Sequence, residues 1–322
     1  MLTRRRAGTG TRSQSESSAL GGQPSSGRSP RHPRRSRLDT IHKVIDASMI
    51  LGDGRTLAYT ECGTPGGPAV LYSHSAPASR LELTFLEERF RQLGVRVISP
   101  DRPGYGRSSS LPGRGLEDWP RDVAALTGHL RIERFAVAGF SSGSPYAVVC
   151  AAAMPGRITG TGVAAGVTDM GWAPAWDGFF EPEADLMRVG DEAEATRRCE
   201  ERYGSDGSGY AGLDLDLGPS DIEVLQDEAT TTALFASMIE AFRQGIAGYA
   251  QDITVQGRPW SFDPARITSP TKILHGAQDT FAPPAHARHT AEIIPGASLT
   301  LLEGHGHLSL IQQLPALAAS LT

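Results

Sequence analysis

Cysteine is scarce in this sequence, and long apolar runs are missing. The three cysteines among 322 residues are Cys62, Cys150 and Cys199, far apart and odd in number. This excludes a dense disulfide framework and any CxxC zinc or redox motif. No apolar run approaches the ~18–20 residues that a membrane-spanning helix needs. With 39% hydrophobic and 21% charged residues, the composition is that of a globular protein of one large domain or two ordinary ones.

The formal net charge of −5 is unevenly distributed along the chain. Residues 1–40 contain nine arginines and two acidic residues, whereas residues 41–322 contain 22 basic and 34 acidic ones. Residues 1–40 are also rich in Ser, Gly and Pro, so we expect a disordered basic tail. No apolar stretch of signal-peptide length follows Arg4–Arg6. We therefore expect a cytoplasmic protein with no membrane or nucleic-acid partner and an unknown oligomeric state; a tail that tethers to nucleic acid or another anionic surface is the alternative.

From residue 41 onward, short apolar segments alternate with helical ones. Strands are predicted at 42–51, 55–61, 69–73, 95–99, 135–140, 158–164, 272–275 and 298–302, the first two flanking a Gly-Asp-Gly turn. Helices are predicted at 79–92, 118–130, 144–154, 283–294 and 308–321. This alternation implies a parallel sheet covered on both faces. Since it stops at 168–254, we predict an α/β core of residues 41–167 and 255–322, interrupted by a helical lid at 168–254.

The motif with the clearest chemistry is Gly139-Phe140-Ser141-Ser142-Gly143, a G-x-S-x-G sequence. It follows an apolar strand and precedes a helix, which is the context that a nucleophile elbow requires. Glycines flank the turn because side chains there would collide with neighbouring backbone. We predict that Ser141 is a nucleophile at the carboxyl edge of the sheet, beside helix N–H groups that can hold an oxyanion.

A serine nucleophile needs a base and an acid that orients the base. With a nucleophile elbow, the acid and then the histidine follow the serine in the chain. His307 comes just after the last predicted strand and is the favoured base, with His305 as the alternative. Asp279 follows the strand at 272–275 and is the favoured acid, with Asp169 as the alternative.

The other downstream histidines are expected to be structural. His275 lies within a predicted strand and should be a core residue. His286 and His289 are three residues apart on a predicted helix, and we expect them on a solvated face.

Two further segments contribute to the predicted site. The segment 72–77 follows the third strand, where the second oxyanion donor belongs, so the backbone amides of Ala76 and Ser142 are the candidate donors. The segment 101–108 contains Pro and Gly turns and is expected to be structural. Aromatic residues near the start of the lid and at the elbow are the candidate substrate pocket: Trp172, Trp176, Phe179 and Phe140.

Together, Gly139–Gly143, Asp101–Ser108, Asp279 and Gly306-His307 resemble the α/β-hydrolase superfamily, over roughly residues 41–322. The resemblance implies an eight-stranded, mostly parallel sheet and a Ser141–Asp279–His307 triad. The family's usual His-Gly after the third strand is here His74-Ser75. Haloalkane dehalogenases and epoxide hydrolases carry an aspartate nucleophile, so the serine disfavours those activities.

These residues predict a serine hydrolase that acts on an ester-like small molecule, a carboxylic ester or lactone, through an acyl-enzyme. The alternatives are an aminopeptidase, a C–C bond hydrolase or perhydrolase with the same triad, and a non-catalytic ligand-binding protein. No cofactor is expected. A zinc site at His305, His307 and Asp279 would lack further ligands, so no metal is expected either.

Overall fold

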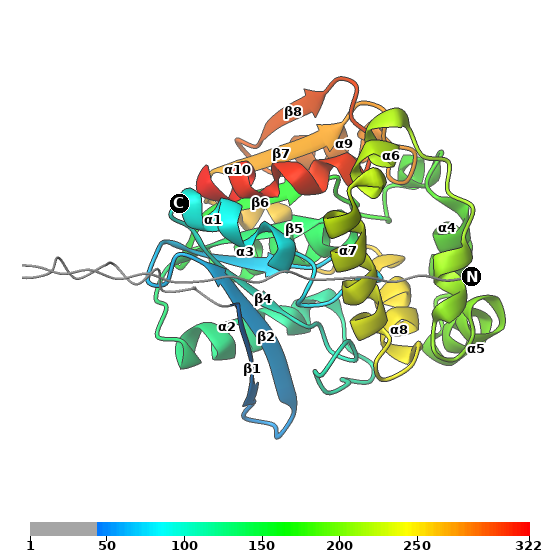
Figure 1. The fold of residues 1–322 in the computed structure, drawn as a ribbon, viewed down its shortest axis with the longest axis horizontal. Helices are drawn as coiled ribbons and strands as arrows, with labels where there is room; N and C mark the ends of the chain where they lie inside the picture. The colour runs from blue at the N-terminus through cyan, green and yellow to red at the C-terminus, as the bar shows by residue number, and fades with distance from the viewer. Residues whose placement is uncertain (1–43) are drawn as a thin grey trace, which may run out of the picture. The chain divides into compact units, whose positions relative to one another are not determined.

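The computed structural model describes residues 44–322, so the predicted basic tail at 1–40 lies outside the described residues. Eight strands form one sheet in the order β1-β2-β4-β3-β5-β6-β7-β8. β2 pairs antiparallel with β1 and β4, and the other five pairs are parallel. The predicted eight-stranded, mostly parallel sheet is therefore confirmed (Figure 1). The strands are β1 Ile45–Ile50, β2 Thr56–Gly63, β3 Ala69–Ser73, β4 Arg96–Pro100, β5 Phe135–Phe140, β6 Ile158–Ala164, β7 Thr271–Gly276 and β8 Ser298–Leu302.

Helices cover both faces of this sheet, as expected for parallel strands. α1 (Glu87–Gln92) and α10 (Leu314–Ala319) pack on one face, and α2 (Trp119–His129), α3 (Ser144–Ala153) and α9 (Pro284–Ile293) on the other. Successive side chains of β5 point to opposite faces of the sheet. Val137 packs with α2, α3 and α9, whereas Ala136 and Ala138 pack with α1 and α10. This period of two makes the central strands apolar throughout.

Two predicted helices are shorter than the sequence suggested. The segment expected at 79–92 is helical only in a 3-10 turn, Thr84–Leu86, followed by α1. Tertiary hydrogen bonds replace the helix at its start, because the Ser79 N–H donates to Ser237 and the Arg80 N–H to Asp101. The segment expected at 308–321 is a 3-10 helix, Leu308–Gln313, followed by α10, whose first turn contains Pro315. Proline has no N–H to continue the preceding turn.

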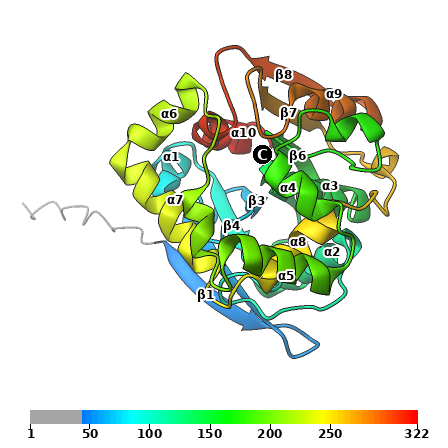
Figure 2. The ribbon, with the colours of Figure 1, turned by 90° about the vertical axis from the view of Figure 1, so that its right-hand side faces the viewer.

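The chain between β6 and β7 forms a helical insertion, defined here as residues 173–256. Its helices have their own apolar cluster, in which Tyr203, Phe242 and Tyr249 pack with Val167 from the segment after β6. Figure 1 shows them together on the right, and Figure 2 faces them. The α-helices are α4 Glu181–Met187, α5 Glu192–Tyr203, α6 Pro219–Gln226, α7 Glu228–Ala241 and α8 Ala247–Gln256. Across residues 44–322, no helix is both long enough and apolar enough to cross a membrane.

Candidate active site

Ser141 stands at a sharp turn between β5 and α3. Its φ of 52° lies in the left-handed region, which is costly for a residue with a side chain. The neighbouring glycines are required by space: a Cβ on Gly139 would lie 2.3 Å from the Gly143 carbonyl oxygen, and one on Gly143 would lie 2.0 Å from that of Ser73. The sequence motif therefore forms a strained elbow that presents the Ser141 hydroxyl at the carboxyl end of β5.

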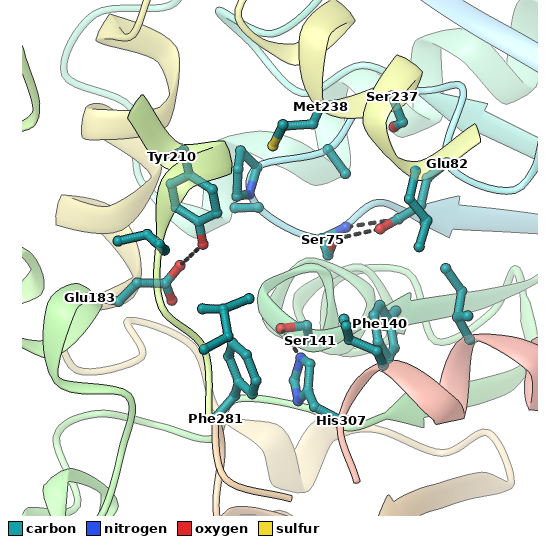
Figure 3. A pocket seen from close by; sticks show the side chains of 18 of the residues that line it. Ser75, Glu82, Phe140, Ser141, Glu183, Tyr210, Ser237, Met238, Phe281 and His307 are labelled. Atoms are coloured by element: carbon teal, nitrogen blue, oxygen red, sulfur yellow. Dashed lines mark hydrogen bonds between the residues drawn. The ribbon is translucent and has the colours of Figure 1, made fainter. Parts of the chain in front are cut away.

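The structure brings Ser141, His307 and Asp279 into one hydrogen-bonded chain. The His307 Nε2 atom lies 2.9 Å from the Ser141 Oγ, and its Nδ1 atom lies 2.8 Å from Asp279 Oδ2. Figure 3 shows the serine and histidine side chains pointing toward each other. The imidazole is enclosed by the rings of Phe140 and Phe281, with centroids 5.2 and 5.0 Å away. This geometry can move a proton from the serine to the histidine.

Asp279 is held by more groups than the sequence indicated. Its Oδ1 accepts the backbone N–H groups of Phe281 and Ala282, and its Oδ2 also lies 3.2 Å from Nε2 of His275. His275 is buried in β7, as expected of a core residue, and it is also a support for the acid. Backbone and histidine contacts thus fix the carboxylate that faces His307.

The electrostatics of this pair favour a charged carboxylate. Burial would raise the pKa of Asp279, but the His307 charge and the hydrogen bonds from both histidines outweigh it and hold the pKa well below its usual value. Burial would lower the pKa of His307, yet the negative charge of Asp279 raises it above 6.5 overall. Asp279 therefore stabilises the imidazolium that proton transfer from Ser141 would create.

The two alternative residues lie elsewhere. Nδ1 of His305 is 3.2 Å from the hydroxyl of Ser309. Asp169 accepts the backbone N–H groups of Gly171 and Trp260, so it stabilises a turn at the start of the insertion. The hydrogen-bonded chain from Ser141 thus contains the favoured histidine, His307, and the favoured acid, Asp279.

The loop after β3 carries the candidate oxyanion donors. Ala76 lies on the wall of the same pocket as Ser141, and Ser142 follows Ser141 in the 3-10 turn Ser141–Gly143. The serine found in place of the usual glycine is held by Glu82: the carboxylate accepts both the Ser75 backbone N–H, at 3.0 Å, and the Ser75 hydroxyl (Figure 3). Glu82 is a site-forming residue that sequence analysis missed.

A buried charge network underlies this loop. Arg102 donates to the carbonyl oxygens of His74 and Ser75 and forms an ion pair, 2.7 Å long, with Asp252 of α8. Asp252 also pairs with Arg114 at 2.6 Å. Arg102 and Asp252 are 0% exposed. The segment 101–108 therefore has a structural role, as predicted, but its connection to the insertion was not foreseen.

Ser141 opens on a cavity of about 220 Å³ between the core and the insertion. Phe140 and Phe179 line it, but Trp172 and Trp176 do not, which corrects the predicted pocket. Trp172 instead stacks on His289 with centroids 4.1 Å apart, and Trp176 faces the Arg188 guanidinium. Most of the lining is aliphatic or aromatic. Part of it comes from α6, α7 and the segment 210–215: Tyr210, Ala211, Leu213, Leu215, Leu225, Leu234, Phe235 and Met238.

The prediction that His286 and His289 lie on a solvated face of α9 is also wrong. His286 is fully buried, and its Nδ1 accepts the backbone N–H of Thr168. Burial lowers the pKa of His286 to about 4, so it is neutral at pH 7. His289 is half-buried against the Thr168 hydroxyl. The segment that follows β6 covers this face of the helix.

A partly exposed carboxyl in the cavity, Glu183 of α4, was not identified from the sequence. Its Oε1 accepts hydrogen bonds from the hydroxyls of Tyr210, at 3.1 Å, and Tyr249, at 3.3 Å. Its local sequence resembles that of the other acidic residues of the insertion. Glu183 differs from them because folding brings two tyrosines to it. Within residues 44–322, no cluster of three or more His, Cys, Asp or Glu side chains could hold a metal ion.

Comparison with known proteins gives concordant results. The model of the alpha/beta hydrolase family matches residues 63–320. The chain is 27% identical to the uncharacterized hydrolase YcgS of Bacillus subtilis, over 80% of this chain and 89% of that protein. It is 27% identical to a non-heme chloroperoxidase of Streptomyces lividans, over 81% and 94%. A thermophilic esterase from Thermogutta terrifontis has the same fold, with a TM-score of 0.62 and 22% identity, over 86% and 96% of the two chains.

Proposed function

Because this chain belongs to the alpha/beta hydrolase family, we propose that it is a serine hydrolase that cleaves carboxylic esters or lactones of small molecules. The observation that carries the proposal is the hydrogen-bonded chain from Ser141 through His307 to Asp279, which opens on an apolar cavity. A ligand-binding protein has no need of a strained serine placed against a histidine whose pKa a buried carboxylate raises.

In the proposed mechanism, His307 removes the proton of the Ser141 hydroxyl as its oxygen attacks the substrate carbonyl. The new negative charge faces the amides of Ala76 and Ser142, and loss of one such donor typically costs ~10²–10³ in rate. His307 then gives its proton to the leaving alcohol. A water molecule, deprotonated by His307 in its turn, hydrolyses the acyl-enzyme and regenerates Ser141.

The first test is covalent labelling. Wild type exposed to a fluorophosphonate should gain one adduct by intact mass, with parallel loss of activity toward short p-nitrophenyl esters. Ser141→Ala should gain none and lose nearly all hydrolysis, whereas Ser261→Ala, at an exposed serine, should behave as wild type. An unlabelled but folded wild type, or an adduct that persists in Ser141→Ala, would refute the assignment of the nucleophile.

The similarity to a protein named as a chloroperoxidase favours a second candidate, in which peroxide replaces water as the acceptor of the acyl group. Both activities share the steps up to the acyl-enzyme, so labelling does not separate them. Product analysis does: with hydrogen peroxide and a simple ester, a peracid product in excess of the carboxylic acid would make transfer to peroxide the main activity.

A further inference from the structure

The cavity beside Ser141 has two carboxyl groups in its wall, and they differ in how they are held. Glu82 accepts hydrogen bonds from Tyr72, the Ser75 amide and the Ser75 hydroxyl, so both of its oxygens are engaged within the protein. Glu183 has both of its hydrogen bonds on Oε1. In the part of the chain that the structure describes, its Oε2 has no hydrogen-bond partner and no arginine or lysine forms an ion pair with Glu183.

The surroundings of Glu183 make this arrangement unusual. Most of the other lining residues, among them Val167, Phe179, Ala211 and Leu213, are apolar. Partial burial in this apolar wall disfavours the charged form and raises the pKa of Glu183 to about 7, despite the two tyrosine hydroxyls. The Oε2 atom in such a place costs free energy unless a further group donates to it or neutralises the charge.

Glu183 lines the same cavity as Ser141 and His307, and its negative charge contributes to the raised pKa of His307. Figure 3 shows Glu183 and Tyr210 across the cavity from Ser75 and Glu82, with Ser141 and His307 also bordering the cavity. A substrate attacked by Ser141 would therefore extend past apolar side chains toward the free oxygen of Glu183.

We propose that Glu183 is a specificity-determining residue that accepts a hydrogen bond from the far end of the substrate. This inference rests on the proposed hydrolase function and names its substrate class: an ester with an apolar middle and a terminal hydrogen-bond donor, either an ammonium or a hydroxyl. Tyr210 and Tyr249 hold the carboxyl in place by occupying Oε1, which leaves Oε2 for the ligand. An ammonium gains most, because the hydrogen bond is then charge-assisted on both sides.

The test compares p-nitrophenyl esters of six- and eight-carbon acids whose chains end in methyl, hydroxyl or ammonium, together with acetate esters of the matching alcohols. The readout is the ratio of kcat/KM for each donor-terminated ester to that of its methyl partner, which a purely structural role would not change. In Glu183→Leu we expect the ratio to fall about tenfold or more for at least one donor, since one charge-assisted hydrogen bond is lost.

Glu183→Gln identifies the donor. In this variant the amide oxygen accepts the two tyrosine hydroxyls at the Oε1 position, and the NH2 group takes the place of Oε2. A hydroxyl can accept a hydrogen bond from this group and an ammonium cannot, so the ratio should be preserved for a hydroxyl and lost for an ammonium. Glu181→Leu is the matched control, because it removes an exposed carboxylate from the same helix outside the cavity lining, and it should leave the ratios unchanged. Ratios that do not change in either Glu183 variant, in both ester series, would overturn the proposal.

The outcome is separable from that of the proposed function. Fluorophosphonate labelling and hydrolysis of the methyl-terminated esters depend on Ser141 and report the hydrolase itself. If wild type hydrolyses no ester, calorimetric titration of Ser141→Ala and of the Ser141→Ala/Glu183→Leu double variant with the same esters measures the recognition alone. Equal affinities of the two proteins for donor-terminated esters would refute the role of Glu183.

Discussion

At the scale of single residues, the site depends on buried carboxylates that are each held by several hydrogen bonds. Asp279 accepts two backbone N–H groups on one oxygen and faces two histidines with the other. This arrangement fixes the ring of His307 with its Nε2 atom toward Ser141. His74 offers no competing base, because burial and the charge of Arg102 lower its pKa well below the usual value.

The pH dependence of activity follows from these contacts. His307 must be neutral to accept the serine proton, and the carboxylates of Asp279, Asp221 and Glu183 raise its pKa above 6.5. Activity should therefore fall as the pH drops through that raised pKa, with the acid limb of the kcat/KM profile centred above pH 6.5. A limb centred below 6.5 would contradict the geometry of the pair.

Asp279→Asn should move that limb to lower pH and reduce kcat by about 10⁴-fold, as the same change does in another triad. The physical reason is that the amide neither stabilises the imidazolium nor selects the required tautomer. Asp169→Asn, at the aspartate that only stabilises a turn, is the control and should keep the wild-type pH profile. Equal losses in both variants would mean that Asp279 has no special role.

At the scale of elements, a helix of the insertion caps the turn that carries His307. Asp221 in α6 is buried and accepts the backbone N–H groups of His307 and Ser309, each at 2.9 Å. A Cβ on Gly306 would lie 2.3 Å from the Asp221 Oδ2, so the glycine before His307 permits this approach. These contacts supply acceptors for N–H groups at the start of a helix, although the acceptor comes from 86 residues away.

Asp221→Asn should reduce kcat by about 10- to 100-fold with little change in KM. Only one of its two side-chain atoms can still accept, and small displacements of a catalytic group have effects of this size. The acid limb should also move to lower pH, because a negative charge near His307 is lost. Asp191→Asn makes the same change at the cap of α5, outside the cavity lining, and steady-state kinetics of that control should match wild type. A kcat as high as the control's would exclude positioning by Asp221.

At the scale of the whole described molecule, the network around Asp252 joins the insertion to the core. The carboxylate of α8 binds Arg102 and Arg114, both from the loop after β4, and Tyr146 of α3 donates to it as well. The two arginines hold the pKa of Asp252 below its usual range despite complete burial. Because Arg102 also binds the carbonyls beneath the candidate oxyanion loop, insertion and site share one network.

Asp252→Asn should lower the free energy of unfolding by about 3–5 kcal/mol, because two buried guanidinium groups lose their counter-charge. The contribution of Asp252 is fully present above its unfolded pKa and is lost only as the pH falls through the lower folded value, so the variant and wild type should differ at pH 7. Urea unfolding followed by circular dichroism measures the change. Asp177→Asn, at an exposed aspartate, should shift the midpoint little, and an equally small shift in Asp252→Asn would show that the network adds no stability.

Much of this molecule is predictable from neighbours along the chain. The sheet strands, the helices α2, α3 and α9 and the elbow at Ser141 all follow from local periodicity and glycine placement, since these reflect contacts within a few residues. The helices α1 and α10 are also predicted from local periodicity, but both are shorter than predicted. Tertiary hydrogen bonds at Ser79 and Arg80 replace the start of the first, and the missing N–H of Pro315 interrupts the second.

The sequence by itself determined the alternation of strands and helices. It also indicated Ser141, His307 and Asp279, which the structure brings together, because the order of these residues and the glycines that flank them are properties of the chain. Only the tertiary structure decided the rest. It placed Glu183 in the cavity and Trp172 outside it, and it set Asp221 and Asp252 against partners 86 and 150 residues away. The acidic residues of the insertion have similar local sequence contexts, and folding alone distinguishes a buried, paired carboxylate from a solvated one.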